Sequence, residues 1–68
     1  MTPAPIDDPR PFDQVLRDWI ARHGGSAYAA APILGSTQQT IGRWLKGAPC
    51  GHERAYRALM TLIDEGRG

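Results

Sequence analysis

Apolar side chains recur three or four residues apart in four short stretches of this chain, and glycines or prolines separate the stretches. Such spacing lines one side of an α-helix with apolar groups, and the alternation with a period of two that is typical of half-buried strands is absent. A chain of 68 residues has room for one small domain, whose core must come from packing these helices together. We therefore expect an all-α protein, a compact bundle of four helices, with a five-helix bundle as the alternative.

The first expected helix starts at about Phe12 and ends before two adjacent glycines, which readily take the left-handed backbone conformation that ends many helices. The residues before this helix include four prolines, so they cannot continue a helix and add little to a core. We predict a flexible, proline-rich N-terminal arm over residues 1–11 and one folded domain over residues 12–66.

The second expected helix lies within residues 27–34, which are rich in alanine and follow Ser26, a candidate cap. Pro32 has no N–H, and in a helix beginning at Ala27 it would remove an internal hydrogen bond at a cost of about 3 kcal/mol. We therefore expect a short or bent helix that begins one or two residues later, which brings the proline close to the first turn.

Basic side chains are concentrated in the middle of the chain. The formal net charge is only +1, but residues 26–57 hold four basic side chains and one acidic one. No carboxylate occurs between Asp18 and Glu53, so an anion that approaches this stretch meets cations without local repulsion. An ordinary solvated surface is the alternative explanation of the same distribution.

The spacing in the middle of the chain fits a helix-turn-helix, in which each position has its own physical reason. A small residue at Ala31 lets two helices approach, Gly35 supplies the tight turn, and Thr37 caps the next helix. Ile41 and Trp44 then hold that helix against the first one. The outward face that remains is short, polar and cationic, which suits the major groove of DNA.

At these residues the chain resembles the lambda repressor/Cro-like, or XRE-like, family of helix-turn-helix proteins. The run Gly-Ser-Thr-Gln-Gln-Thr-Ile at residues 35–41 is particularly similar to the start of the recognition helix in phage repressors of that family. The motif covers about residues 27–46. The resemblance implies a transcriptional repressor of the Cro type that binds an inverted-repeat operator in double-stranded DNA as a homodimer.

The resemblance also implies which side chains contact DNA. Glutamine pairs with the edge of adenine, and arginine pairs with guanine or a phosphate. Hydroxyl and ammonium groups contact phosphates of the DNA backbone and so position the protein on the duplex. The implied base-contacting residues are Gln38, Gln39 and Arg43. The implied phosphate-contacting residues are Ser26, Ser36, Thr37 and Lys46. Arg54 and Arg57 are further candidates for phosphate contact, with a solvated surface or the rim of a dimer as the alternative.

A dimer needs a surface, and the last expected helix, residues 52–65, carries a broad apolar face. One recognition helix covers only part of a turn of DNA, so proteins of this kind pair two half-sites about one turn apart. The candidate dimer residues are Tyr56, Leu59, Met60 and Ile63.

The main alternative is a protein-interaction module, such as an antitoxin-like or phage-encoded inhibitor that uses the helical scaffold to bind a protein. The modest net charge favours it, as do Pro32 and Ala27, the latter standing where the family often has a phosphate-binding glutamine. An architectural DNA binder without sequence preference is disfavoured because such proteins usually carry much more basic charge.

The sequence lacks the residues that metal-binding proteins, enzymes and membrane proteins need. One cysteine and two histidines without paired spacing do not make a structural zinc site, so we expect no metal and no other cofactor. No arrangement typical of a catalytic site is present, so we expect neither an enzyme nor a small-molecule ligand.

No apolar run approaches the roughly 20 residues of a membrane span, and residues 1–11 lack the pattern of a secretory signal. We expect a cytoplasmic protein, bacterial or phage-encoded, without membrane contact.

Overall fold

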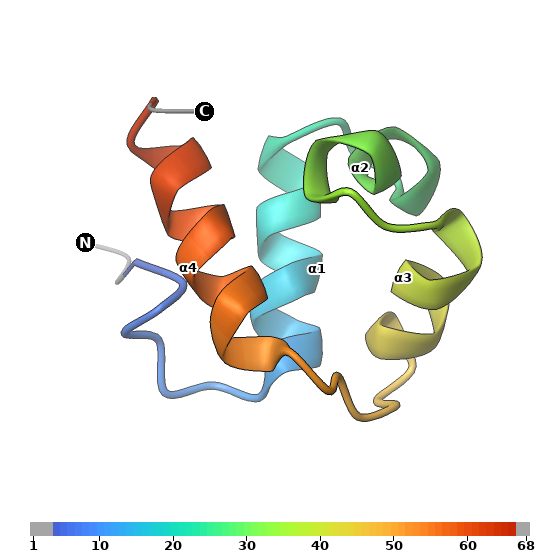
Figure 1. Cartoon of the computed structure of the whole chain (residues 1–68), viewed down its shortest axis with the longest axis horizontal. Helices are drawn as coiled ribbons and strands as arrows, with labels where there is room; N and C mark the ends of the chain where they lie inside the picture. The colour runs from blue at the N-terminus through green and yellow to red at the C-terminus, as the bar shows by residue number, and fades with distance from the viewer. Residues whose placement is uncertain (1–3, 67–68) are drawn as a thin grey trace.

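Four helices follow one another along the chain in a computed structural model that describes residues 4–66 (Figure 1). They are α1 (Phe12–Arg22), α2 (Ala27–Leu34), α3 (Gln38–Leu45) and α4 (Glu53–Asp64). No strand occurs within residues 4–66, and the overall extents are 29 × 22 × 18 Å. The expected all-α class and the count of four helices are therefore confirmed. No helix in the described part of the chain has the length and apolar content that crossing a membrane requires.

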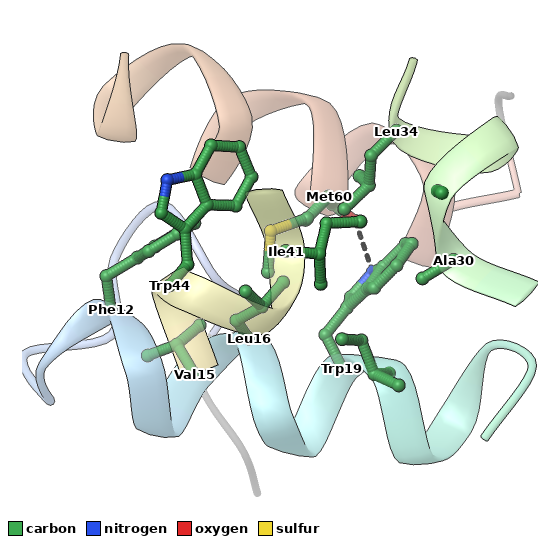
Figure 2. Packing of buried hydrophobic residues seen from close by; sticks show 11 residues of the cluster. Phe12, Val15, Leu16, Trp19, Ala30, Leu34, Ile41, Trp44 and Met60 are labelled. Atoms are coloured by element: carbon green, nitrogen blue, oxygen red, sulfur yellow. Dashed lines mark hydrogen bonds between the residues drawn. The ribbon is translucent and has the colours of Figure 1, made fainter. Parts of the chain in front are cut away.

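α1 stands at the centre of the fold, with α4 on one side of it and α2 and α3 on the other in Figure 1. Its apolar stripe is buried throughout, as the spacing predicts. Figure 2 shows the middle of the core, where Trp19 lies near Met60 and donates a hydrogen bond from Nε1 to its backbone carbonyl at 3.3 Å. The fully buried large side chains are Leu16, Trp19, Ile41 and Met60.

The starts of α2 and α3 have the capping contacts that the sequence predicts. The Ser26 hydroxyl accepts a hydrogen bond from the Ala29 N–H at 3.2 Å, and the Thr37 hydroxyl accepts one from the Thr40 N–H at 3.1 Å. Gly35 ends α2 with φ +66° and ψ 33°, a left-handed conformation that costs glycine little. Gly35 and Thr37 therefore mark the two ends of the short connection between α2 and α3.

The expected later start of α2 is wrong, because the helix begins at Ala27 and contains Pro32 at an internal position. The Ser26 cap fixes the start, and the burial of Ala30, Ala31 and Leu34 against the core offsets the one backbone hydrogen bond that proline cannot make. Tertiary packing has overridden the local preference.

Residues 4–11, for which the sequence predicts a flexible arm, are hydrogen-bonded to α4. The Arg57 guanidinium donates to three backbone carbonyls of this segment, those of Pro5, Asp8 and Arg10, at 2.9 Å each. Arg57 is 9% exposed, so it is not available for the phosphate contact that the sequence allowed. Residues 1–3 of the predicted arm lie outside the described residues.

A second set of contacts fastens the same segment to α1. Arg10 pairs with the Asp8 carboxylate at 2.8 Å and also with Asp18 on α1. The side-chain hydrogen bond from Arg10 lowers the pKa of Asp8 to about 2. The N-terminal segment is thus joined to two helices through backbone carbonyls and carboxylates rather than through apolar packing alone.

Candidate nucleic-acid interface

α3 has one buried side and one side open to solvent. Ile41 is fully buried, and Trp44 packs edge-on against Phe12 with ring centroids 5.9 Å apart. These contacts hold the helix in one rotation about its axis, which decides what the other side presents. The exposed side chains on that outward face, hereafter the α3 face, are Gln38, Gln39, Arg43 and Lys46.

The structure therefore brings together all three predicted base-contacting residues, with Lys46 beside them. At 100° per residue, positions 38, 39, 43 and 46 fall within an arc of about 140° on one side of the helix. Position 42, near the middle of that arc, is a glycine, and an added Cβ there would meet nothing within 4 Å. The centre of the α3 face is therefore bare backbone.

The cations of the α3 face are not neutralised by neighbouring carboxylates. Within residues 4–66 the ion pairs of arginines involve Arg10, Arg22 and Arg57, each at a contact between segments or along α4. Neither Arg43 nor Lys46 forms an ion pair there. A carboxylate close to Arg43 or Lys46 would weaken the attraction of these cations for an anion. Without such a pair, both charges face solvent or an anionic partner.

The predicted phosphate-contacting hydroxyls lie just before the start of α2 and just before the start of α3. Ser26 and Thr37 use their oxygens as caps, and Thr37 also donates its hydroxyl hydrogen to the Thr40 oxygen at 2.8 Å. Ser36 is half-buried and lines a hollow together with Gln38. Ser36 and Thr37 thus lie in the turn between α2 and α3, whereas Ser26 lies at the opposite end of α2.

Arg54 lies apart from this group. It is exposed near the start of α4, where it lines a hollow with Asp7, Glu53 and Ile6. Acidic side chains surround it there, unlike the cations of the α3 face. The structure does not bring Arg54 to the α3 face.

No family model, curated protein or solved structure matches this chain. Within residues 4–66, no three His, Cys, Asp or Glu side chains come together as ligands of a metal ion would. Cys50 is a free, half-buried thiol beside the core.

The candidate dimer surface on α4 needs one correction. Met60 is wrong as a surface residue, because it points into the core and is 0% exposed. Tyr56, Leu59 and Ile63 are half-buried and pack against the same core. The sequence showed an apolar face too broad for one contact, but not which of its rows faces inward.

The outward row on α4 has a different membership from the predicted one. Leu62, which is not among the predicted dimer residues, is 50% exposed, and Ala55 is exposed as well. Leu59 lies between them in the helical spacing of three and four residues, and it lines a shallow hollow with Ala55 and Tyr56. We call Ala55, Leu59 and Leu62 the α4 stripe.

Proposed function

We propose that this protein is a sequence-specific regulator of transcription that binds double-stranded DNA, most closely a small repressor of the Cro type. In this proposal α2, the turn at Gly35 and α3 form a helix-turn-helix, and α3 is the recognition helix that enters the major groove. The observation that carries the proposal is the α3 face, which is polar, cationic and exposed, on a helix whose other side is held in the core. An α-helix of this kind fits the width of the major groove.

The side chains of the α3 face divide into two roles. Gln38 and Gln39, at the start of the helix, have amide groups that donate to and accept from the edge of adenine. Arg43, about one turn further on, has the fork of donors that matches guanine. Lys46, at the end of α3, carries a mobile ammonium group that suits a phosphate.

We further propose that the protein acts as a homodimer through the α4 stripe. An apolar row on an otherwise polar helix gains free energy when a second copy covers it. Two copies related by a two-fold axis would present two α3 faces to an inverted repeat with half-sites about one turn apart.

A protein-interaction module is the second candidate function, and the α4 stripe is the observation that favours it. Leu62 is half exposed, and the hollow beside Leu59 measures about 320 Å³. A different protein would bury that surface as a second copy would. In that case the α3 face would have no role in binding.

The experiment that tests the proposal is selection of bound duplexes from a random-sequence pool by purified protein at a low and a higher salt concentration. We expect an enriched inverted repeat that is still bound at the higher salt, because base contacts persist where phosphate contacts weaken. The control is a Gln38→Ala, Arg43→Ala double variant, which should not enrich that repeat. Retention of DNA only at low salt, with no enriched sequence, would contradict the proposal and favour the protein-interaction module.

A further inference from the structure

Tyr28, in the first turn of α2, is the most exposed large apolar side chain of the described residues. Its exposed fraction is 74%, whereas Phe12, Trp19 and Trp44 are buried and Tyr56 is half-buried. No hydrogen bond within residues 4–66 involves its hydroxyl. The ring therefore adds little to the core, and its hydroxyl is available to a ligand.

The Tyr28 side chain borders a hollow of about 430 Å³ between α2 and the start of α3. Ala29, Ala31 and Pro32 supply an apolar lining, and Ser36 and Gln38 supply polar groups. Pockets of 300 to 1,000 Å³ hold small organic ligands, so the hollow has room for one sugar–phosphate unit. Gln38 lines this hollow and is also part of the α3 face, so the hollow adjoins the α3 face.

The chemistry of the lining favours an anionic ligand with an apolar part. The hydroxyls of Tyr28 and Ser36 and the amide of Gln38 can all donate hydrogen bonds, and no carboxylate lines the hollow. The chain has no acidic residue between Asp18 and Glu53, so nothing nearby in the sequence repels an anion. A deoxyribose phosphate combines these properties, since its sugar is largely apolar on its faces and its phosphate accepts hydrogen bonds.

We propose that this hollow holds a sugar–phosphate unit of the DNA strand whose base Gln38 contacts, with the Tyr28 hydroxyl donating to a phosphate oxygen. In this arrangement the ring of Tyr28 covers the deoxyribose, and Pro32 lies beneath the sugar. This inference rests on the proposed function, and it adds a positioning residue on α2 that sets how Gln38 meets its base. A protein side chain in the same hollow is the competing occupant.

The test compares Tyr28→Phe and Tyr28→Ala on the duplex that the random-pool selection enriches. Tyr28→Phe keeps the ring and removes the hydroxyl, so we expect binding to weaken about tenfold, the loss of one hydrogen bond to a charged group. Tyr28→Ala also removes the cover over the sugar and should weaken binding further. Ile33→Ala is the matched control, because Ile33 is an exposed apolar residue of α2 that does not line the hollow.

Neutral methylphosphonate groups, placed one at a time along the duplex, identify the phosphate. We expect one position at which the neutral group weakens binding by the wild-type protein but adds nothing to the loss caused by Tyr28→Phe. Equal binding by Tyr28→Ala and wild type, or an equal loss with Ile33→Ala, would overturn this inference and leave the proposed function standing. Failure of the wild type to enrich any duplex would overturn both.

Discussion

Arg57 donates a hydrogen bond from Nη1 to the backbone carbonyl of Asp8 at 2.9 Å, although 49 positions separate the two residues in sequence. The same guanidinium donates to the carbonyls of Pro5 and Arg10, and its Nε pairs with Glu53 at 2.8 Å. One side chain thus satisfies several backbone acceptors of a segment that has no helix or strand of its own. Together with the Arg10–Asp18 ion pair, this residue fastens the N-terminal segment to the helices.

Replacing Arg57 by alanine should therefore destabilise the protein by about 3 kcal/mol, because buried carbonyls lose their donors. Urea denaturation followed by circular dichroism measures the free energy of unfolding. Arg54→Ala is the matched control, since Arg54 lies on the same helix, is exposed and forms no hydrogen bond or ion pair within residues 4–66. We expect the control to change stability by less than about 0.5 kcal/mol. Equal effects of the two substitutions would show that the three carbonyl contacts contribute nothing.

The Asp8 carboxylate makes the stability of this segment depend on pH in the acid range. The Arg10 hydrogen bond lowers the pKa of Asp8 from 3.8 to about 2 in the folded protein. The unfolded chain therefore takes up a proton first, and the stability that Asp8 provides above pH 4 is lost as the pH falls towards 2. Urea midpoints at a series of pH values should converge for wild type and Asp8→Asn near pH 2. Asp7→Asn, at an exposed neighbour with no ion pair in the described chain, should instead parallel wild type throughout.

What the sequence predicted well was local, and what it missed depended on distant partners. The Ser26 and Thr37 caps follow from hydrogen bonds within four residues of the chain, so the sequence alone indicates them. Arg57 looked like a surface cation because its acceptors are backbone carbonyls, which carry no sequence signal. Met60 and Leu62 are both apolar, and only the packing of α4 against the core shows that the first is buried and the second exposed.

On the α3 face, Gln38→Ala should weaken binding to the preferred operator by about 1 to 3 kcal/mol and relax the preference at one base position. Lys46→Ala should weaken binding to all sequences alike and reduce the slope of log affinity against log salt by about 1. Fluorescence anisotropy on the operator and on single-base variants, at several salt concentrations, separates the two effects. Identical behaviour of the two variants would contradict the proposed division into base and phosphate contacts.

Charges placed on the exposed part of the α4 stripe should produce a folded monomer. Ala55 and Leu62 are exposed in the single chain, so Ala55→Asp with Leu62→Asp leaves the core intact but opposes burial of the stripe in a dimer. Sedimentation equilibrium measures the oligomeric state, and operator binding should weaken with loss of the dimer. Ile33→Asp, which puts the same charge on an exposed apolar residue of α2, should leave the oligomeric state unchanged. A wild-type protein that is monomeric at every concentration would contradict the proposed dimer.

Gly42 offers a substitution that should improve the fold and impair DNA binding. Glycine within a helix costs about 0.5 to 1 kcal/mol relative to alanine. A Cβ at position 42 of α3 would meet no atom within 4 Å. Gly42→Ala should therefore stabilise the folded protein by about 0.5 to 1 kcal/mol. If the α3 face lies against base edges, the added methyl group near its centre separates the helix from the groove, and we expect at least about a tenfold loss of operator binding, or 1.4 kcal/mol. Thermal unfolding measures the stability, and fluorescence anisotropy on the same samples measures operator binding.

Gly51→Ala is the matched control, because its Cβ is equally unobstructed but lies in the loop before α4, and it should leave operator binding unchanged. A Gly42→Ala protein that binds the operator as tightly as wild type would mean that the backbone of α3 does not approach the bases.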